Sequence, residues 1–408
     1  MRLIFLNRFY WPETPATAQL LTDLAEGLAA AGHTVSVIAS RGAGTLPARE
    51  THESVEILRV RGTRCSGLGL PGKAVDFATF YLGALWRLGA TLRRGDILIV
   101  LTDPPLIGLG AGAVARLRGA DVVHWVQDIY PELAIALARQ SWLRLLRPLR
   151  NRAWRRAQAC VTLGTDMASV LAKAGVPAAR QAIIPNWPPA GLAPADAGAI
   201  ARVRAAWGVA DKFVVGYSGN LGRVHDLQSV LALADAFRAD PGVAFVLVGH
   251  GPQRAWLEAE VRARGLDNVT FQAARTREEL PASLAAADVQ LVTLQAGCEQ
   301  LVFPSKLYGI AAVGRPVAFI GPADCEVARL VREHELGLAA AADRIDQMVA
   351  ALRQLQRDPI RVSHHATAAL RFATSHDAAH ALARWQTLLQ GLHACGFGAG
   401  RGKDSPSA

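Results

Sequence analysis

The sequence predicts an α/β protein with two domains in tandem, each built on a mostly parallel β-sheet. Short apolar strands alternate with helical stretches along most of the chain, which is the pattern of a parallel sheet covered by helices on both faces. The 408 residues, of which 51% are hydrophobic, suffice for two separate cores. Midway, the non-periodic stretch at residues 182–190 gathers Pro, Asn and Trp, and this indicates a crossing between domains.

The first domain is predicted over residues 1–187. In a doubly wound sheet ligands bind at the carboxyl ends of the strands, so the loops after the strands are the places where a site is expected. The strands are expected at residues 2–9, 34–40, 55–62, 96–102 and 121–128, and the helices at residues 18–31, 74–92 and 106–118.

The second domain is predicted over residues 188–375. One of its helices, at residues 276–286, should be capped by Thr276 with Glu279 three positions later. A helix at residues 376–392 has no strand after it and is expected to pack back on the first domain, and residues 396–408, rich in Gly and Ser, are expected to be disordered. Further strands are expected at residues 212–219, 243–249, 268–273, 289–294 and 317–320, and further helices at residues 226–239 and 252–264.

Composition excludes several classes of protein. The five cysteines are scattered, without a CxxC pair or a His cluster at metal spacing, which predicts no metal site and fits a reducing cytoplasm. The amino terminus lacks the charged region and cleavage site of a signal peptide. The best candidate for a membrane span, residues 97–117, contains Asp103 and two prolines, so no transmembrane helix is expected. A net charge of +10 indicates an anionic partner.

Residues 303–317, FPSKLYGIAAVGRPV, predict an anion site at the start of a helix. Ser305 is a preferred N-cap, which leaves the next backbone N–H groups facing a ligand. Lys306 adds a mobile positive charge, and Leu307 is assigned to the same donor-binding turn. Gly314 is expected to end the helix before the next strand. The alternative is an ordinary helix that begins with Ser and ends with Gly.

Two glycine-containing turns follow strands of the second domain, in VVGYSGNLGRVHD (214–226) and VGHGPQ (248–253). Glycine permits a tight turn whose backbone N–H groups face a diphosphate, and a basic side chain there would add charge. The alternative is a pair of ordinary turns in which glycine only meets the geometry. The predicted donor-binding residues of these turns are Gly219, Asn220, Arg223, His225, Gly249 and Gly251.

Two loops of the first domain carry further candidates. In WVQDIYPE (125–132), Asp128 and Glu132 follow a strand and are predicted to be catalytic, as a base or as hydrogen-bond partners of a sugar. The alternative for Glu132 is a structural place in the first turn of a helix. In NRFYWPETPAT (7–17), aromatic rings and hydroxyls suit an acceptor, although the loop could equally be a rigid connection. The predicted acceptor-binding residues are Tyr10, Glu13 and Thr14.

The string GLGAGA, residues 108–113, formally fits a dinucleotide-binding pattern. It does not open directly after a strand, so its glycines are predicted to serve close helix packing instead. His124 alternates with apolar neighbours in a strand and is predicted to be a core residue.

The segment Ser141 to Ala157 interleaves tryptophans and leucines with arginines. This pattern predicts an interfacial helix on an anionic membrane, or alternatively a helix with an arginine-rich solvent face. Nucleic acid is not an expected partner, because the charge is accompanied by apolar residues at helical spacing and by no nucleic-acid-binding module.

Several motifs together resemble family 4 of the GT-B glycosyltransferases. These are DIYPE (128–132), IPNW (184–187), YSGN (217–220), VGHGP (248–252), PSKLYG (304–309) and GRPV (314–317), and the similarity extends over residues 1–392. The chain looks closest to the bacterial branch that builds exopolysaccharide or O-antigen units. The resemblance implies two Rossmann-like doubly wound domains facing an interdomain cleft, with the donor on the second domain and the acceptor on the first. It also implies a metal-independent reaction with no cofactor.

The chain departs from the family pattern at the donor site. The usual Gly-Arg turn reads Gly219 and Asn220 here, and His225 stands where a lysine is usual. The usual pair of glutamates falls at Leu301 and Gly309. Arg223 and Lys306 are therefore the candidates to stabilise the diphosphate.

The expected function is that of a retaining glycosyltransferase of the hexosyltransferase type. It would move a sugar from a nucleotide diphosphate donor, expected to be a UDP-sugar, to a polyprenyl-diphosphate-linked saccharide in the synthesis of bacterial exopolysaccharide or lipopolysaccharide. The expected place is the inner face of the cytoplasmic membrane, as a peripheral protein. The alternatives are a sugar-nucleotide epimerase of related fold and a non-catalytic GT-B subunit that binds nucleotide sugar.

Overall fold

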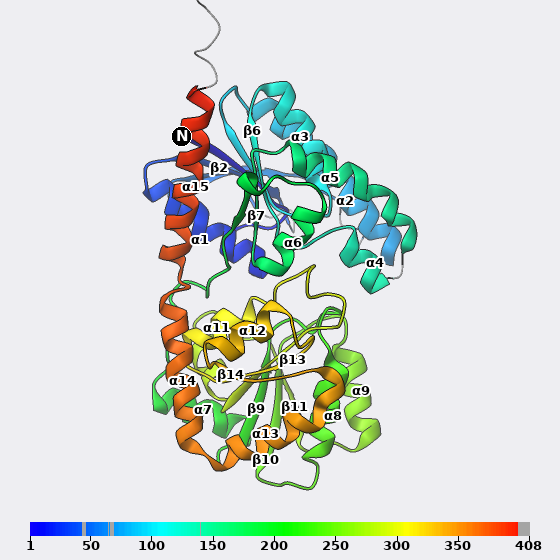
Figure 1. Ribbon diagram of the computed structural model, residues 1–408, viewed down its shortest axis with the longest axis vertical. Helices are drawn as coiled ribbons and strands as arrows, with labels where there is room; N and C mark the ends of the chain where they lie inside the picture. Colours follow the sequence, from blue (N-terminus) through cyan, green and yellow to red (C-terminus); the bar gives the residue numbers. More distant parts are fainter. Residues whose placement is uncertain (43–45, 64, 66–68, 139, 399–408) are drawn as a thin grey trace, which may run out of the picture. The chain divides into compact units, whose positions relative to one another are not determined.

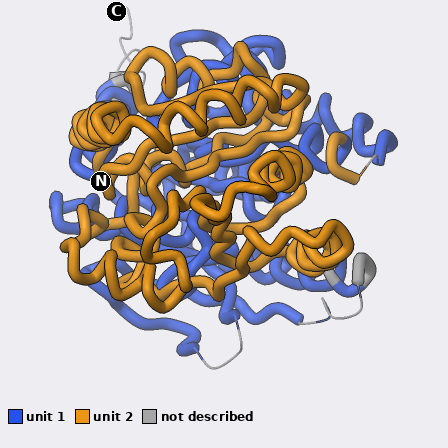
Figure 2. Tube along the Cα trace, turned by 90° about the horizontal axis from the view of Figure 1, so that it is seen from below, with its two compact units in different colours: residues 1–135, 139–185, 378–408 blue, residues 136–138, 186–377 orange. Residues whose placement is uncertain are grey.

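The computed structural model describes all residues except 43–45, 64, 66–68, 139 and 399–408. The chain divides into two compact units, shown in different colours in Figure 2. The first unit comprises residues 1–135, 139–185 and 378–408, and the second comprises residues 136–138 and 186–377. The main crossing follows Pro185, two residues before the position predicted from the sequence.

The first unit contains an eight-stranded sheet in the order β3-β4-β2-β1-β5-β6-β7-β8. Every neighbouring pair is parallel except β3 with β4. The central strands consist of buried apolar residues, as expected for a sheet covered on both faces. The strands are β1 (Arg2–Leu6), β2 (Thr34–Ser40), β3 (Arg49–His52), β4 (Val55–Val60), β5 (Ile97–Val100), β6 (Asp121–Trp125), β7 (Ala159–Thr162) and β8 (Gln181–Ile183).

The last helix of the chain, α15, belongs to the first unit and packs against α1, as Figure 1 shows. Trp385 of α15 lies edge-on to Trp125 at a centroid distance of 5.1 Å, so the end of the chain completes the first core. The helices are α1 (Ala16–Ala30), α2 (Gly69–Thr91), α3 (Ile107–Arg118), α4 (Glu132–Ala138), η2 (Ser141–Leu146), α5 (Arg147–Arg156), α6 (Thr165–Lys173), η3 (Ala178–Arg180) and α15 (Ala378–Gly398).

Two glycines of α3 are explained by packing. A Cβ at Gly108 would lie 2.5 Å from Cε1 of His124, and one at Gly110 would lie 2.8 Å from Cδ1 of Leu85. The prediction that GLGAGA serves close packing is confirmed for Gly108 and Gly110, whereas a Cβ at Gly112 would have no neighbour within 4 Å. His124 is buried, as predicted, and burial lowers its pKa to about 4, so its imidazole is neutral.

The second unit contains a six-stranded parallel sheet in the order β11-β10-β9-β12-β13-β14. The strands are β9 (Phe213–Ser218), β10 (Val243–Val248), β11 (Val269–Gln272), β12 (Val289–Thr293), β13 (Val317–Ile320) and β14 (Gly337–Ala340). The helices are α7 (Ala197–Ala206), α8 (Leu227–Ala236), α9 (Arg254–Arg264), α10 (Leu280–Ala285), α11 (Lys306–Ala312), α12 (Glu326–Glu333), η4 (Ala342–Arg344), α13 (Ile345–Arg357) and α14 (Pro359–Thr374).

Three predicted helices differ from the observed ones. The segment from Ser141 to Ala157 is the 3-10 helix η2 followed by α5, because Pro148 lies in the first turn of α5 and begins a new helix there. Thr276 and Glu279 exchange hydrogen bonds as predicted, but α10 begins only at Leu280. The last helix runs to Gly398, beyond the start of the predicted disorder, and the remaining residues of that prediction, 399–408, lie outside the described residues.

No helix within the described residues is both long and apolar enough to cross a bilayer. In the same part of the chain, no group of three or more His, Cys, Asp or Glu residues is placed to hold a metal ion.

Candidate functional site

The turns after β9 and β10 pack backbone against backbone. The N–H of Leu221 donates to the carbonyl of His250 at 2.8 Å, and the N–H of Gly219 donates to the carbonyl of Val248 at 3.0 Å. A Cβ at Gly249, where φ is 135°, would lie 2.1 Å from the carbonyl oxygen of Gly219. Only glycine can lie at position 249, because any side chain would collide with the neighbouring turn. The close contact holds the Gly219 turn at the carboxyl edge of the sheet.

We expect Gly249→Ala to lower the free energy of unfolding by about 1–3 kcal/mol, because the new methyl group must displace the Gly219 turn. Chemical denaturation measures this change. Gly219→Ala is the matched control, because Gly219 has a similar φ, 126°, but its Cβ position has only side-chain atoms of Lys306 within 4 Å, at 3.6 Å. If both substitutions lower the free energy of unfolding by the same amount, backbone strain alone would explain the loss of stability.

Lys306 extends from the start of α11 to the Gly219 turn. Its Nζ lies 3.6 Å from the ring centroid of Tyr217 and 3.6 Å from the position that a Cβ would take at Gly219. Nζ is buried and has no hydrogen-bond partner among the described residues. Burial lowers the pKa of Lys306 to about 7. A buried ammonium without a counter-ion next to exposed loop backbone is suited to receive an anion.

His225 does not supply the charge that the sequence suggested. It is buried, and its Nδ1 lies 2.8 Å from the carbonyl oxygen of Thr293. Burial and the neighbouring Lys306 lower the pKa of His225 to about 3, so the ring is neutral and its N–H donates to that carbonyl. Arg223, in contrast, is exposed on the same turn and has no ion pair with a described residue. Of the two basic side chains of this turn, only Arg223 is available to an anion.

The segment around Ser305 also differs from its prediction. Ser305 has helical dihedral angles, φ −60° and ψ −17°, and makes no capping hydrogen bond within the described structure. Leu307 is 0% exposed, so its side chain packs in the core, and a donor contact of this residue stays a prediction. Gly314, with φ 66°, ends the helical turn as predicted. The proposed anion grip therefore depends on Lys306 more than on the start of α11, which has only seven residues.

The space around Gly309 is filled, so the glutamate that is usual in the family would not fit at this position as the structure stands. A Cβ at this buried position would lie 3.4 Å from Cδ2 of Leu192. A longer side chain would have to displace that leucine. The nearby Glu299 is half-buried, and its carboxylate accepts a hydrogen bond from the N–H of Gly297 at 2.7 Å.

In the first unit, Asp128 lies at the carboxyl edge of the sheet, after β6. Its backbone N–H donates to the Thr102 hydroxyl at 3.1 Å. Burial, together with the negative charge of Asp103, raises the pKa of Asp128 to about 7. Asp103 is itself paired with Arg8, whose Nη2 donates to Oδ2 at 3.2 Å and whose Nε lies 3.1 Å from Oδ1. Asp128 is thus a carboxyl group that changes its charge near neutral pH.

A small cavity of 30 Å³ opens beside Asp128. Thr102, Tyr130, His124 and Arg150 are among the residues that line it. Burial and the charges of Asp128 and Asp103 raise the pKa of Tyr130, so its hydroxyl stays protonated. The cavity has room for about one water molecule and places a titratable carboxyl beside hydroxyl groups.

Glu132 is held in ion pairs, in agreement with the structural alternative for this residue, and its catalytic role stays a prediction. Its Oε1 accepts from Nη2 of Arg150 at 2.7 Å and lies 3.1 Å from Nε of Arg147. Arg150 is buried, donates to the carbonyl of Tyr130 at 2.8 Å and lies over the ring of Trp154 at 3.8 Å. A buried guanidinium needs a counter-charge, and Glu132 supplies it.

The loop at residues 7–17 is largely a rigid connection. Tyr10 is 1% exposed, so its side chain packs in the core, and acceptor binding by this residue stays a prediction. Glu13 is half-buried near the N–H of Tyr10, and burial raises its pKa. Thr14 is exposed. Only Glu13 and Thr14 of the three predicted residues are accessible.

Sequence reasoning missed the Arg8–Asp103 pair and the ring of Tyr217. Both members of the pair follow strands, where site residues were expected. Because 95 positions separate them in the chain, the sequence did not indicate that they pair. Tyr217 lies inside a strand, where an aromatic residue is normally read as core.

Two family models match the chain. Residues 17–187 match the glycosyl transferase 4-like domain, and residues 201–371 match the glycosyl transferases group 1. A Streptomyces kanamyceticus protein, 2-deoxystreptamine glucosyltransferase, is 31% identical over 321 residues, which cover 73% of this chain and 80% of the relative. Escherichia coli WcaI, named for glycosyl transfer in colanic acid biosynthesis, is 27% identical over 384 residues, covering 87% and 92%.

Solved structures of similar fold include Anabaena HepE in complex with UDP and glucose, with a TM-score of 0.73 and 17% identity, covering 96% of this chain and 100% of that one. WaaG, a glycosyltransferase involved in lipopolysaccharide biosynthesis, has a TM-score of 0.70 at 17% identity, covering 95% and 98%. These two structures share the GT-B fold, and the two Rossmann-like units described above agree with it.

Proposed function

Because the chain belongs to the group 1 glycosyltransferases, hexosyltransferases that use nucleotide-sugar donors, we propose that it is a retaining enzyme that takes a hexose from a UDP-sugar. The acceptor in this proposal is a saccharide carried on polyprenyl diphosphate, and the product enters a bacterial surface polysaccharide. HepE is named as a complex with UDP-glucose, and the names of WcaI and WaaG refer to colanic acid and lipopolysaccharide biosynthesis. These names support the donor and the class of product.

The observation that carries the proposal is the unpaired ammonium of Lys306 beside the Gly219 turn. Negative charge accumulates on the diphosphate as the bond to the sugar breaks. Lys306 and Arg223 would balance that charge, and in this proposal no metal ion is needed. Asp128 is proposed as the carboxylate beside the reacting carbon.

The test is transfer of labelled sugar to a polyprenyl-diphosphate-linked saccharide, with a panel of UDP-sugars and with EDTA present. Transfer with retained anomeric configuration, read by NMR, is expected. Conversion of the donor alone into another sugar nucleotide would instead indicate an epimerase. Donor binding without turnover of any UDP-sugar in the panel would favour a non-catalytic subunit, and loss of transfer in EDTA would contradict metal independence.

The affinity for UDP is expected to fall as the pH rises above about 7. The ammonium of Lys306 prevails below that pH in the free protein, and a bound diphosphate favours the charged form, so binding takes up a proton. The dissociation constant should rise by up to about tenfold per pH unit while Lys306 loses its proton.

Isothermal titration calorimetry between about pH 6.5 and about pH 8.5, in two buffers of different ionisation enthalpy, measures both the affinity and the proton uptake. His225 is neutral in this range, and burial raises the pKa of Tyr217, so neither contributes. A slope that persists after Lys306→Met would assign the effect to another group.

We also propose that the protein associates with a membrane surface through residues 141–157. Trp142 and Leu145 in η2 are 63% and 78% exposed, and arginines flank them. Arg150 and Trp154, which the sequence pattern counted with this surface, are buried against the first unit instead. The part of the protein surface that can contact a membrane is therefore smaller than the sequence pattern suggested.

The double substitution Trp142→Ala and Leu145→Ala is expected to reduce co-sedimentation with anionic vesicles at least about tenfold, because two exposed apolar side chains no longer enter the lipid. Leu370→Ala with Ile360→Ala, exposed apolar residues of α14, is the control. If both double variants lose vesicle binding equally, the membrane contact could not be assigned to η2.

A further inference from the structure

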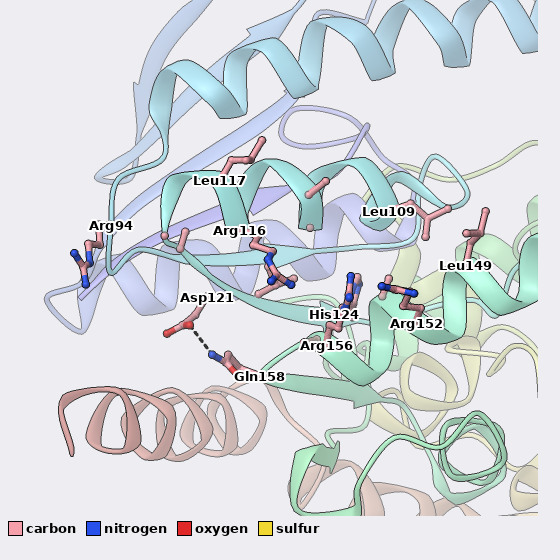
Figure 3. A pocket seen from close by; sticks show the side chains of 17 residues that line it. Arg94, Leu109, Arg116, Leu117, Asp121, His124, Leu149, Arg152, Arg156 and Gln158 are labelled. Atoms are coloured by element: carbon pink, nitrogen blue, oxygen red, sulfur yellow. Dashed lines mark hydrogen bonds between the residues drawn. The ribbon is translucent and has the colours of Figure 1, made fainter. Parts of the chain in front are cut away.

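A groove of 960 Å³ lies between α3 and α5 in the first unit, over β6. Figure 3 shows the groove from close by, with side chains entering it from both helices. His124 lines this groove and also the small cavity beside Asp128, so the two spaces adjoin at that residue. The groove is otherwise distinct from the residues assigned to donor, acceptor or catalysis.

Arginines dominate the polar lining. Arg116 comes from α3, Arg152 and Arg156 come from α5, and Arg94 precedes β5. In Figure 3 Arg116, Arg152 and Arg156 gather near the middle of the groove, and Arg94 lies toward one end. The charges of Arg152 and Arg116 lower the pKa of Arg156, which means that the guanidinium groups repel one another.

This positive charge is not balanced by the protein. None of the four arginines forms an ion pair with a described residue. The acidic residue of the lining, Asp121, accepts a hydrogen bond from Nε2 of Gln158 at 2.6 Å, and its charge offsets only one of the four positive charges. An uncompensated cluster of guanidinium groups is a site for a phosphate, which accepts paired N–H bonds from them.

The remainder of the groove is aliphatic. Leu117 and Leu149 on its two helices are 85% and 54% exposed, and small residues such as Ala113 and Ala153 line the space between. The lining contains no aromatic ring other than the neutral His124. A nucleotide or a sugar would gain from an aromatic face, whereas a phosphate that carries aliphatic chains fits guanidinium groups bordered by leucines.

Neighbouring helices extend the apolar surface. α3 packs against both α2 and α5, and α2 carries the exposed side chains Leu82 and Trp86. Three adjacent helices thus each present large exposed apolar residues, which marks an interaction surface rather than isolated exposed side chains.

We propose that the α3–α5 groove binds the phosphate head group of an anionic membrane phospholipid, with Leu117 and Leu149 against its acyl chains. Arg116, Arg152 and Arg156 hold the phosphate. The inference rests on the proposed membrane association and deepens it, because it assigns a discrete site and includes α3. Arg116 and Arg156 lie near the carboxyl ends of α3 and α5, which lead into the amino ends of β6 and β7, whereas Asp128 follows the carboxyl end of β6. The bound phosphate therefore lies away from the Asp128 edge.

The test compares two charge-matched variants of the full chain on vesicles of phosphatidylcholine with and without phosphatidylglycerol. Arg116→Gln with Arg152→Gln removes two groove arginines. Arg61→Gln with Arg87→Gln removes two arginines of the first unit that lie outside both the groove lining and residues 141–157. The groove variant is expected to bind phosphatidylglycerol vesicles at least about tenfold more weakly than the control variant, because diffuse attraction to the surface would weaken both equally.

Equal weakening of both variants would overturn the groove site while leaving membrane association intact. No binding by the unchanged protein would overturn both proposals. Circular dichroism and the thermal unfolding midpoint, expected to be unchanged in each variant, verify that the substituted first unit is folded.

A second measurement separates a lipid from a free phosphate. Calorimetry with a short-chain phosphatidylglycerol below its micelle concentration is expected to show one site that disappears in the groove variant. Glycerol phosphate alone is expected to bind at least about tenfold more weakly, because it lacks the chains that contact Leu117 and Leu149. Equal affinity for both would overturn the assignment to a phospholipid.

Discussion

Replacement of Lys306 by Met is expected to weaken UDP binding by about 100-fold, or ~2.7 kcal/mol, and to make the free protein more stable. The ammonium is buried, lies over Tyr217 and has no hydrogen-bond partner in the described part of the chain. A diphosphate would supply the missing counter-charge, so the variant loses an ion pair in the complex. Calorimetric titration with UDP measures the loss.

The gain in stability follows from the sign of the pKa shift. Burial lowers the pKa of Lys306 in the folded protein to about 7, well below the value of about 10.4 in an unfolded chain. The unfolded chain therefore binds the proton more tightly, and the folded protein is penalised most at and below pH 7, with the penalty fading as the pH rises toward about 10. Met keeps the length and removes the charge, so the free energy of unfolding should rise by about 1–2 kcal/mol at neutral pH.

Lys212→Met is the control, since Lys212 is partly exposed at the start of β9 and the substitution removes the same charge. It should change neither UDP affinity nor stability noticeably. A Lys306→Met protein that is less stable, and that binds UDP as the unchanged protein does, would mean that Lys306 serves the fold and not the donor.

Asp128→Asn is expected to lower kcat by about 10²- to 10⁴-fold while leaving UDP affinity within about twofold. Asn has nearly the same shape but cannot become negative, and in the proposed reaction the carboxylate stabilises positive charge on the sugar. Asp128 belongs to the first unit and the Lys306 site to the second, so the two effects should separate. Steady-state transfer assays and UDP titrations measure them. Asp211→Asn, at an exposed position of the second unit, is the control.

The dependence of kcat on pH is a second test of the role of Asp128. Its pKa is raised to about 7 by burial and by Asp103, so the carboxylate prevails above that pH and kcat should rise as the pH passes through about 7. Asp103→Asn removes the repelling charge and frees Arg8, so the rise should move to lower pH. A profile that stays in place would show that Asp103 does not act on Asp128. UDP affinity falls over the same range as Lys306 loses its proton, so kcat/KM should peak near neutral pH.

Much of the fold was predictable because its signals are local. Buried apolar strands such as residues 2–6 and 243–248 are flanked by glycines, prolines and helical periodicity within a few residues, so their order and the parallel sheets follow from the sequence. The edge strand β3 was missed, because its four residues, RETH, carry no apolar pattern. The end of α15 was misjudged, because Gly and Ser weaken a helix without excluding it.

The candidate site was predictable only in part. The turns at Gly219 and Gly249 and the residues Lys306 and Asp128 were identified, since glycines and charges directly after strands are a local signal. Glu132 carried the same signal but is paired with Arg150, 18 positions away. Tyr10 and Leu307 lie in the right segments but point into the core, and a segment's composition does not fix which way each side chain points.

The sequence by itself determined the two-domain α/β architecture, the family and the segments that approach the carboxyl edges of the sheets. The tertiary structure decided which of those residues carry usable charge. Lys306 has no hydrogen-bond partner among the residues that the structure describes, His225 is neutral and Glu132 is paired with Arg150. Each state depends on burial and on atoms brought together from distant parts of the chain. Burial and pairing set the charge of a group, and neither is a property of the residue or of its sequence neighbours.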